Sequence, residues 1–591
     1  MRKGRPFARF LGVLAVAGAA GGCADRSAPL PQQTSHSAGV GRELPRDAKA
    51  RLDVLEHDDL DAEMIESPIT ATWLGARGHD DAIDDVRLDA QARTAARLKA
   101  LHDRVRAVDE SQLDAPRALD RTLLLRRTEN ALYDLTELRP LERNPVVYID
   151  LASSAVEELL TDDTAPDRAR SLAARLWKIR PLLDEARRNL RGPVAELAVR
   201  RAIELALAAK GFIAETLPKA MQPADAKVAD DFRAAAGDAS RALDDFAGWL
   251  QRDLLPRAHG DFALGRERFL EKLRLVEGLE GVTPEQLVAL GEREIKDARK
   301  RYDEAARQVI AGRAGADPIK IIEEDHAKPD ELTIQAQSTA EAITEFVRGQ
   351  KLVTLPEPER PKVVDLPPAL WGFAQLSVSG PLEPKPRDGY LYIDPVDKSW
   401  PDRRKQEHLR TLNRPAMVMA LMHELTGQYV LAERNRHAPT TVQKVALAPA
   451  FVEGWAGYAE RMLLDAGFGA GDARVRLVVE RAALLRAARL VAAVRLHALS
   501  AKIDDVAKQF SDEAYADDYQ ARREAERAAL DPWVLYDALG RIEIEKLRDD
   551  WRAAHPDATL GAFHDALLGH GTPPVTQLRK ILLPDGKRPP I

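Results

Sequence analysis

Apolar residues recur at steps of three and four along much of this chain, which is the spacing of one helix face. The pattern is clear in residues 172–179 and 194–207. At Thr283 the order Thr-Pro-Glu supplies an N-cap, a proline at the first helical position and an acidic first turn. A helix is expected from there to about Arg313. Residues 48–350 are therefore predicted to form an N-terminal helical region.

Between residues 351 and 400 the pattern changes to short runs of β-forming residues, separated by proline or glycine. Such runs predict strands, so we expect a small mixed β region here. Helical spacing returns over residues 401–591, the predicted C-terminal helical region of catalytic type. The fold class is predicted to be mainly α, a large helical body with a small β-sheet. The predicted strands begin at Lys351, Lys362, Phe373 and Gly389.

The first residues are predicted to form a secretory signal. A basic start precedes an apolar run, residues 10–20, which is too short to span a membrane. The run leads to Ala-Gly-Gly-Cys, which resembles a bacterial lipobox and implies lipidation of Cys23. The alternative is an ordinary signal peptide with an incidental cysteine. Residues 1–23 are thus the predicted signal peptide, and residues 24–47, rich in Ser, Pro, Gln and Gly, a flexible tether.

The lipobox resemblance implies an exported cell-envelope lipoprotein that is held to the membrane through a lipid on Cys23. With Ala24 after the cysteine, it further implies the outer membrane, facing the periplasm. The chain has 87 basic and 94 acidic residues, a net charge of −7, so no basic excess indicates a nucleic-acid partner. Because Cys23 is the single cysteine, no internal disulfide can form.

The candidate chemistry begins with His423 and Glu424, adjacent in the sequence, and Glu453 further along. A His-Glu step on one helix and a Glu on the next is how many zinc hydrolases are built. In a regular helix Gln428, five residues after His423, is rotated away by ~140°. A one-residue π-bulge would return it to the face of His423, and Gly427 makes such a distortion easy. The alternative is a buried His-Glu pair satisfied by its neighbours.

Two further helices carry polar residues at helical spacing. Glu460 lies seven residues after Glu453 and so on the same face. A later helix places Arg486, Arg489 and His497 near one face. These side chains could hold a substrate carboxylate or a developing oxyanion. They could equally form a solvated basic face, and the residues alone do not decide.

Many ordered segments resemble the bacterial family called domain of unknown function 885, zincin-like peptidases. The most specific match is Val452–Glu460, and the resemblance extends over most of the mature chain. It implies a zincin-like fold with the sheet next to the His-Glu helix, and a zinc-dependent peptidase that hydrolyses peptide or amide bonds with metal-activated water. Other matching segments are Ser67–Gly75, Gly389–Pro395, Met422–Glu424 and Leu484–Arg489.

Carried over residue by residue, the resemblance makes His423 and Glu453 zinc ligands and Glu424 the general base. The family motif continues with Pro-Gly-His, whereas this chain has Gln428 where the second histidine is expected. Gln428, Glu460 or His437 would then complete the metal site.

The predicted roles extend beyond the metal ligands. Arg489 and His497 are expected to steady charge during catalysis, and Tyr392, Arg486 and Tyr536 to bind a peptide or amide substrate. The alternative is a catalytically inactive, metal-poor relative that acts as a peptide-binding or scaffold lipoprotein. The substrate sequence and the protein partners do not follow from these residues.

Overall fold

The computed structural model describes most of the chain after residue 43. The described residues are 44–161, 167–221, 223, 225–312, 316–366, 374–584 and 591. The predicted signal peptide with Cys23 lies outside them, as do residues 24–43 of the predicted tether. Within the described ranges, no helix combines the length and apolarity needed to cross a membrane.

The chain forms two compact units, which divide inside the predicted N-terminal helical region. The N-terminal unit extends to Gly260 and includes Leu382–Pro384. The C-terminal unit comprises Asp261–Pro381 and Lys385–Ile591. All residues with predicted chemistry in the described ranges belong to the C-terminal unit.

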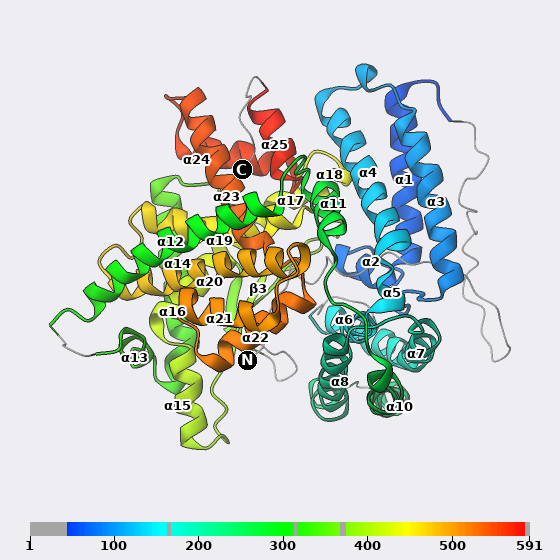
Figure 1. The fold of residues 1–591 in the computed structure, drawn as a ribbon, viewed down its shortest axis with the longest axis horizontal. Coiled ribbons are helices and arrows are strands. Elements are labelled where there is room, and N and C mark those ends of the chain that lie inside the picture. Colours follow the sequence, from blue (N-terminus) through cyan, green and yellow to red (C-terminus); the bar gives the residue numbers. More distant parts are fainter. Residues whose placement is uncertain are drawn as a thin grey trace. The chain divides into compact units, whose positions relative to one another are not determined.

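The N-terminal unit is built from helices (Figure 1). The helical prediction is confirmed for residues 172–179, in α7, and for residues 196–207, in α8, while residues 194 and 195 precede that helix. A buried arginine, Arg175, joins helices by donating to Ala155 O and to Thr72 Oγ1 at 3.1 and 2.6 Å. The helices are α1 (Ala48–Glu66), α2 (Pro68–Leu74), α3 (Leu88–Arg106), η2 (Glu110–Gln112), α4 (Ala115–Tyr133), η3 (Asp134–Leu138), α5 (Pro140–Arg143), α6 (Val146–Thr161), α7 (Arg168–Asn189), α8 (Glu196–Gly211), η4 (Phe212–Thr216), α9 (Leu217–Ala220), α10 (Ala226–Trp249), η5 (Leu250–Leu254) and η6 (Leu255–Arg257).

The C-terminal unit is also mainly helical and contains the sheet (Figure 1). Thr283 caps its long helix α12 as predicted, in a reciprocal capping box with Gln286. The helices are α11 (Arg266–Glu277), α12 (Pro284–Val309), α13 (Pro318–Glu323), η7 (Pro329–Glu331), α14 (Leu332–Gln350), α15 (Asp402–Thr411), α16 (Arg414–Leu421), η8 (Met422–Tyr429), α17 (Val430–Arg436), α18 (Thr441–Val445), α19 (Pro449–Asp465), α20 (Ala473–Ala498), α21 (Ile503–Ala514), α22 (Asp518–Leu530), α23 (Tyr536–Ala554), α24 (Leu560–Leu567), η9 (Leu568–His570) and α25 (Val575–Leu582).

The sheet has three strands, β1 (Lys362–Asp365), β2 (Ala374–Ser377) and β3 (Tyr390–Ile393), in the order β1-β3-β2. β3 pairs parallel to β1 and antiparallel to β2. β2 is an edge strand and lies against η8. The prediction of a mainly helical fold with a small sheet beside the His-Glu helix is therefore confirmed.

The predicted strand beginning at Lys351 is wrong. Its residues are rich in β-formers, but their backbone bonds to side chains of α24 and not to a neighbouring strand. Leu352 O bonds to the His564 ring at 2.5 Å, and Thr354 N donates to Asp565 at 3.0 Å. The apolar side chains Leu352 and Val353 are buried in the core, which explains the apolar pattern without a strand.

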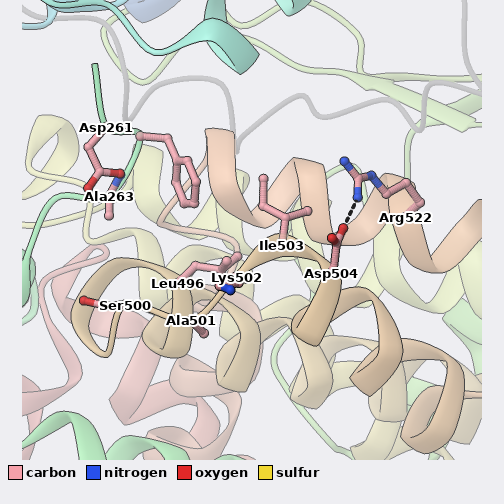
Figure 2. A pocket seen from close by; sticks show the side chains of 10 residues that line it. Asp261, Ala263, Leu496, Ser500, Ala501, Lys502, Ile503, Asp504 and Arg522 are labelled. Carbon is pink, nitrogen blue, oxygen red and sulfur yellow. Dashed lines mark hydrogen bonds and ion pairs between the residues drawn. The ribbon is translucent and has the colours of Figure 1, made fainter. Parts of the chain in front are cut away.

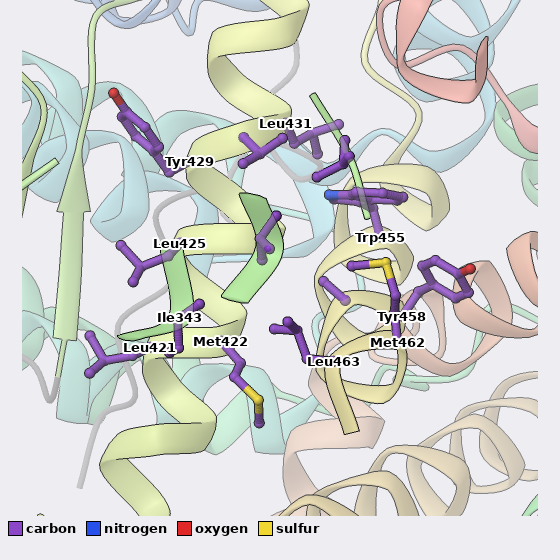
Figure 3. Packing of buried hydrophobic residues seen from close by; sticks show 14 of the residues in the cluster. Ile343, Leu421, Met422, Leu425, Tyr429, Leu431, Trp455, Tyr458, Met462 and Leu463 are labelled. Atoms are coloured by element: carbon purple, nitrogen blue, oxygen red, sulfur yellow. The ribbon is translucent and has the colours of Figure 1, made fainter. Parts of the chain in front are cut away.

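The core of the C-terminal unit lies between η8, α14 and α19. Apolar side chains of the His-Glu helix meet those of α19 there, as Figure 3 shows. This packing fixes the two helices that carry the candidate site. The side chains labelled in Figure 3 are Ile343, Leu421, Met422, Leu425, Tyr429, Leu431, Trp455, Tyr458, Met462 and Leu463.

Small residues let α19 approach its neighbours closely. A Cβ on Gly427 would lie 2.7 Å from the Cα of Ala456, so η8 and α19 meet backbone to backbone. On the other side of α19, a Cβ on Gly540 of α23 would lie 1.6 Å from Ala450 O. No larger residue fits either position without moving a helix. The glycines thereby set the positions of the glutamates on α19.

Candidate active site

The His-Glu helix is continuous from α16 through η8 to α17, and η8 is a π-helical segment. Asn413 caps its start by accepting from Ala416 N at 3.0 Å. The π-helical segment is the kind of distortion that would return Gln428 to the face of His423, since the wider turn rotates Gln428 back toward that side. The Trp455 indole donates to Thr426 O at 3.1 Å, so a backbone carbonyl in the π segment has a partner from α19.

His423 is held by a chain of ion pairs from three other helices. Its Nδ1 lies 2.7 Å from Glu460 Oε1. Both oxygens of Glu460 also accept from the Arg486 guanidinium, each at 2.7 Å. Arg486 Nε lies 2.8 Å from Asp537 Oδ2. The network thus joins η8, α19, α20 and α23 around one imidazole.

Burial and the neighbouring charges shift the pKa values of Glu460 and His423. Although burial raises the pKa of Glu460, Arg486 and His423 outweigh it and lower that pKa to about 2. Glu460 is 1% exposed, so an ionised carboxylate here requires these partners. For His423, burial lowers the pKa, but Glu460 raises it by more, and the net change is upward. The pair therefore favours a proton on the Nδ1 side of the ring.

Glu424 is buried, with 7% of its surface exposed. Burial raises its pKa to about 7, with His423 opposing and Glu453 and Glu460 adding to the rise. Its Oε2 has no hydrogen-bond partner within the described residues. A carboxyl whose pKa lies near neutral can accept and release a proton at ambient pH, as a general base requires.

Two of the remaining predicted ligands, Glu453 and Gln428, lie on the same two helices as Glu460 and His423. Glu453 is half-buried and close enough to influence the charges of Glu424 and Arg486. Gln428 is 3% exposed, and its Oε1 lacks a hydrogen-bond partner in the described parts of the chain. His423 uses Nδ1 for Glu460, and no described residue bonds to its Nε2.

These atoms determine how well a metal would fit. Among the described residues, no group of three or more His, Cys, Asp or Glu side chains could hold a metal ion. A third protein ligand would therefore be the buried amide oxygen of Gln428. One imidazole nitrogen with amide and carboxylate oxygens fits a divalent cation, although it is less suited to Zn²⁺ than two imidazoles.

Arg489 and His497 lie on α20, and their partners are residues of other helices away from His423. Arg489 forms a two-bond ion pair with Glu524, with both distances 2.7 Å. His497 is buried, stacks on the Phe269 ring and lies 2.8 Å from Ala528 O through Nε2. Burial lowers its pKa. The structure does not bring either side chain into contact with His423.

The other predicted residues are spread over the C-terminal unit. Tyr392 is half-buried on β3, where its ring stacks with Tyr390 at 5.9 Å. Tyr536 is buried at the start of α23 and stacks on Trp533 at 5.6 Å. His437 is exposed just after α17, at the far end of the His-Glu helix.

Sequence reasoning missed two participants near the site. Asp537 is next to Tyr536, and its role appears only when α23 packs against α20. His564 bonds to Tyr458 of α19, the helix that also carries Glu453 and Glu460, and to Leu352 O, at 2.8 and 2.5 Å. Burial lowers the pKa of His564 to about 4, so it is a neutral structural histidine. Neither residue has a spacing signal that would have identified it.

A separate cavity of about 420 Å³ lies where α20 ends and α21 begins (Figure 2). Arg522 and Asp504 form an ion pair at its rim. Phe262 contributes an apolar wall, and its ring meets His497 edge-on at 6.0 Å. The cavity is lined by Asp261, Phe262, Ala263, Leu496, Ser500, Ala501, Lys502, Ile503, Asp504 and Arg522.

Comparisons with known proteins agree on the fold. The family described as "Bacterial protein of unknown function (DUF885)" matches residues 68–582. A structure described as that of "a putative lipoprotein of unknown function from Shewanella oneidensis" is 22% identical, with a TM-score of 0.72, covering 90% of this chain and 99% of the other. A second, "the putative lipoprotein from Colwellia psychrerythraea", is 16% identical, with a TM-score of 0.74 and coverages of 91% and 98%. No curated protein matches the sequence.

Proposed function

Since the chain belongs to the DUF885 family of bacterial proteins of unknown function, we propose that it is a zincin-like, metal-assisted hydrolase of peptide or amide bonds. The observation that carries the proposal is the orientation of His423. Its Nδ1 faces the buried carboxylate of Glu460, which leaves Nε2 without a hydrogen-bond partner among the described residues. Metal-binding histidines are commonly oriented by a carboxylate in this way.

The residues that would hold the ion are His423, Glu453 and Gln428. A bound divalent ion would act as a Lewis acid that polarises the scissile carbonyl. Glu424 takes a proton from the attacking water, whose oxygen bonds to the carbonyl carbon. As the carbon–nitrogen bond breaks, Glu424 passes that proton to the leaving amine. A pKa of about 7 suits Glu424 to both steps.

An extended peptide is the substrate class that suits the surroundings. β2 is an edge strand that lies against η8. A peptide that paired with the outer edge of β2 would run past the His-Glu helix, held by backbone hydrogen bonds. Arg489 and His497 are assigned no role in this proposal, because each already has close partners elsewhere.

The test is hydrolysis of a mixed peptide library, followed by mass spectrometry, with added Zn²⁺ or Mn²⁺. Glu424→Gln should lower the rate by about 10²- to 10⁴-fold, the usual contribution of a general base. Glu433→Gln is the control, because Glu433 is a buried glutamate on the adjoining helix α17. A Glu424→Gln protein that cleaves at the wild-type rate would remove Glu424 from the mechanism.

Gln428 favours a second candidate, a metal-poor relative that binds peptides or acts as a scaffold without cleaving them. An amide oxygen is a weaker zinc ligand than the imidazole it replaces. In this case the library would bind to the protein and remain intact, with or without added metal. Metal-dependent cleavage that Glu424→Gln abolishes would exclude this candidate.

We also propose that the protein is a lipid-anchored protein of the cell envelope, at the outer membrane facing the periplasm. Two solved structures of similar fold are described as putative lipoproteins. The sequence before Cys23 resembles a lipobox. Metabolic labelling with a palmitate analogue should mark the wild-type protein and not Cys23→Ser. Equal labelling of both would exclude this anchor.

A further inference from the structure

We propose that Arg486, together with Asp537, acts through Glu460 to fix the tautomer of His423, so that Nδ1 carries the proton and Nε2 faces the site as an acceptor. This rests on the proposed function for its purpose, although the tautomer itself can be measured without any activity. It assigns Arg486 as a positioning residue, where the sequence predicted a substrate-binding one.

The assignment follows from the donors and acceptors in contact. Glu460 Oε1 accepts from Arg486 Nη2 and also lies 2.7 Å from His423 Nδ1. Glu460 Oε2 accepts from Arg486 Nη1. An ionised carboxylate has only acceptors, so the imidazole atom that faces it must be an N–H. A neutral imidazole carries one ring proton, which leaves Nε2 with its lone pair.

Arg486 keeps Glu460 in its ionised, acceptor-only form. The two-bond guanidinium–carboxylate geometry is rigid and strong, and it fixes both oxygens of Glu460. Asp537 occupies a third donor of Arg486, its Nε, at 2.8 Å. Gly457 allows this approach, since a Cβ there would lie 3.0 Å from Asp537 Oδ1. Arg486 is therefore held by Asp537 on one side and by Glu460 on the other.

The same helix provides a matched control. Arg489 is one turn after Arg486 on α20 and forms an equivalent two-bond pair with Glu524. That pair includes neither Glu460 nor His423. Replacing Arg489 removes a similar ion pair from the same helix without touching the imidazole network, so it separates positioning of His423 from general stability of α20.

The experiment is NMR of protein labelled with ring-¹⁵N histidine. The chain has 13 histidines, and a His423→Asn spectrum identifies the signals of His423 by difference. At alkaline pH, where the imidazole is neutral, wild-type His423 should be protonated at Nδ1 and unprotonated at Nε2. Arg486→Met should convert this single tautomer into a mixture, Arg486→Lys should restore part of it, and Arg489→Met should leave it unchanged.

Glu460→Gln is the second test of the positioning role if Arg486→Met does not fold. An amide offers one acceptor atom where the network uses two, so it cannot serve the histidine and the full guanidinium together. The single tautomer should then be lost. Where metal binds, both variants should weaken it by about 10- to 100-fold, the usual effect of losing a ligand-orienting partner.

Two results would overturn the inference. One is a wild-type His423 that carries its proton on Nε2. The other is an unchanged Nδ1–H tautomer in both Arg486→Met and Glu460→Gln. If instead the tautomer behaves as expected but no variant and no wild-type protein binds metal or cleaves peptides, the positioning role stands and the hydrolase proposal fails.

Discussion

Replacing Glu424 by Gln should make the protein more stable at alkaline pH and leave it unchanged in acid. The carboxyl has a pKa of about 7 in the folded protein, raised by burial from 4.5. Below 4.5 it is neutral in both folded and unfolded chains. Between 4.5 and about 7 only the unfolded chain ionises it, so folding loses stability as pH rises. Each pH unit of difference corresponds to about 1.4 kcal/mol, so the full loss above pH 7 is about 3 kcal/mol.

The measurement is urea unfolding at pH 4.5 and pH 8 in the presence of a chelator, with hydrogen exchange of α19 peptides reporting the C-terminal unit. Gln has nearly the same size as Glu but carries no ionisable group. Glu424→Gln should gain about 3 kcal/mol over wild type between the two pH values. Glu341→Gln, at an exposed site on α14, is the control for loss of one acidic group. An equal effect of Glu424→Gln at both pH values would show that this carboxyl is not buried and perturbed as described.

Three further predictions concern the surroundings of the site. Gln428→His should raise zinc affinity by at least about 10-fold in a competition assay with a chromophoric chelator, since it restores an imidazole ligand; unchanged affinity would exclude Gln428 from the metal site. Gly540→Ala should destabilise the protein by about 1–3 kcal/mol or more in urea unfolding, because its Cβ would overlap Ala450 O, whereas Gly349→Ala, with open space around it, should not; equal effects would contradict the close packing of α19 on α23. Burial lowers the pKa of His564 from 6.5 to about 4, so its stabilising contribution is present above pH 6.5 and is lost by about pH 4. The corresponding loss of unfolding free energy, about 3 kcal/mol between pH 7 and pH 4, should be absent in His564→Gln. An unaltered acid sensitivity of this variant would count against a buried neutral histidine.

The helices and most of the sheet could be predicted, because their patterns are local. The capping box at Thr283 is complete within four residues. For the π segment, Gly427 showed only that such a distortion would be easy, and Gln428 that it would be needed to face His423. In contrast, the run beginning at Lys351 has the composition of a strand but bonds to α24. α24 is distant in sequence, so no local pattern near Lys351 indicates this contact.

The site was only partly predictable for the same reason. His423, Glu424 and Glu453 were found from a motif and its spacing. The partners of Arg486 and Arg489 were not, because helical spacing states which residues share a face and not which helix packs against that face. Glu460 reaches Arg486 from α19, and Glu524 reaches Arg489 from α22. His497 is surrounded by phenylalanines from a segment more than 200 residues earlier.

The central claim is that His423 and Glu453 act together in one metal-binding site. Calorimetric titration of metal-free protein with Zn²⁺ and Mn²⁺ tests it most directly. We expect one ion per chain in wild type, at least about 10-fold weaker binding in His423→Asn and in Glu453→Gln, and unchanged binding in Arg489→Met. Binding that survives both ligand substitutions, or no binding by the wild-type protein, would contradict it.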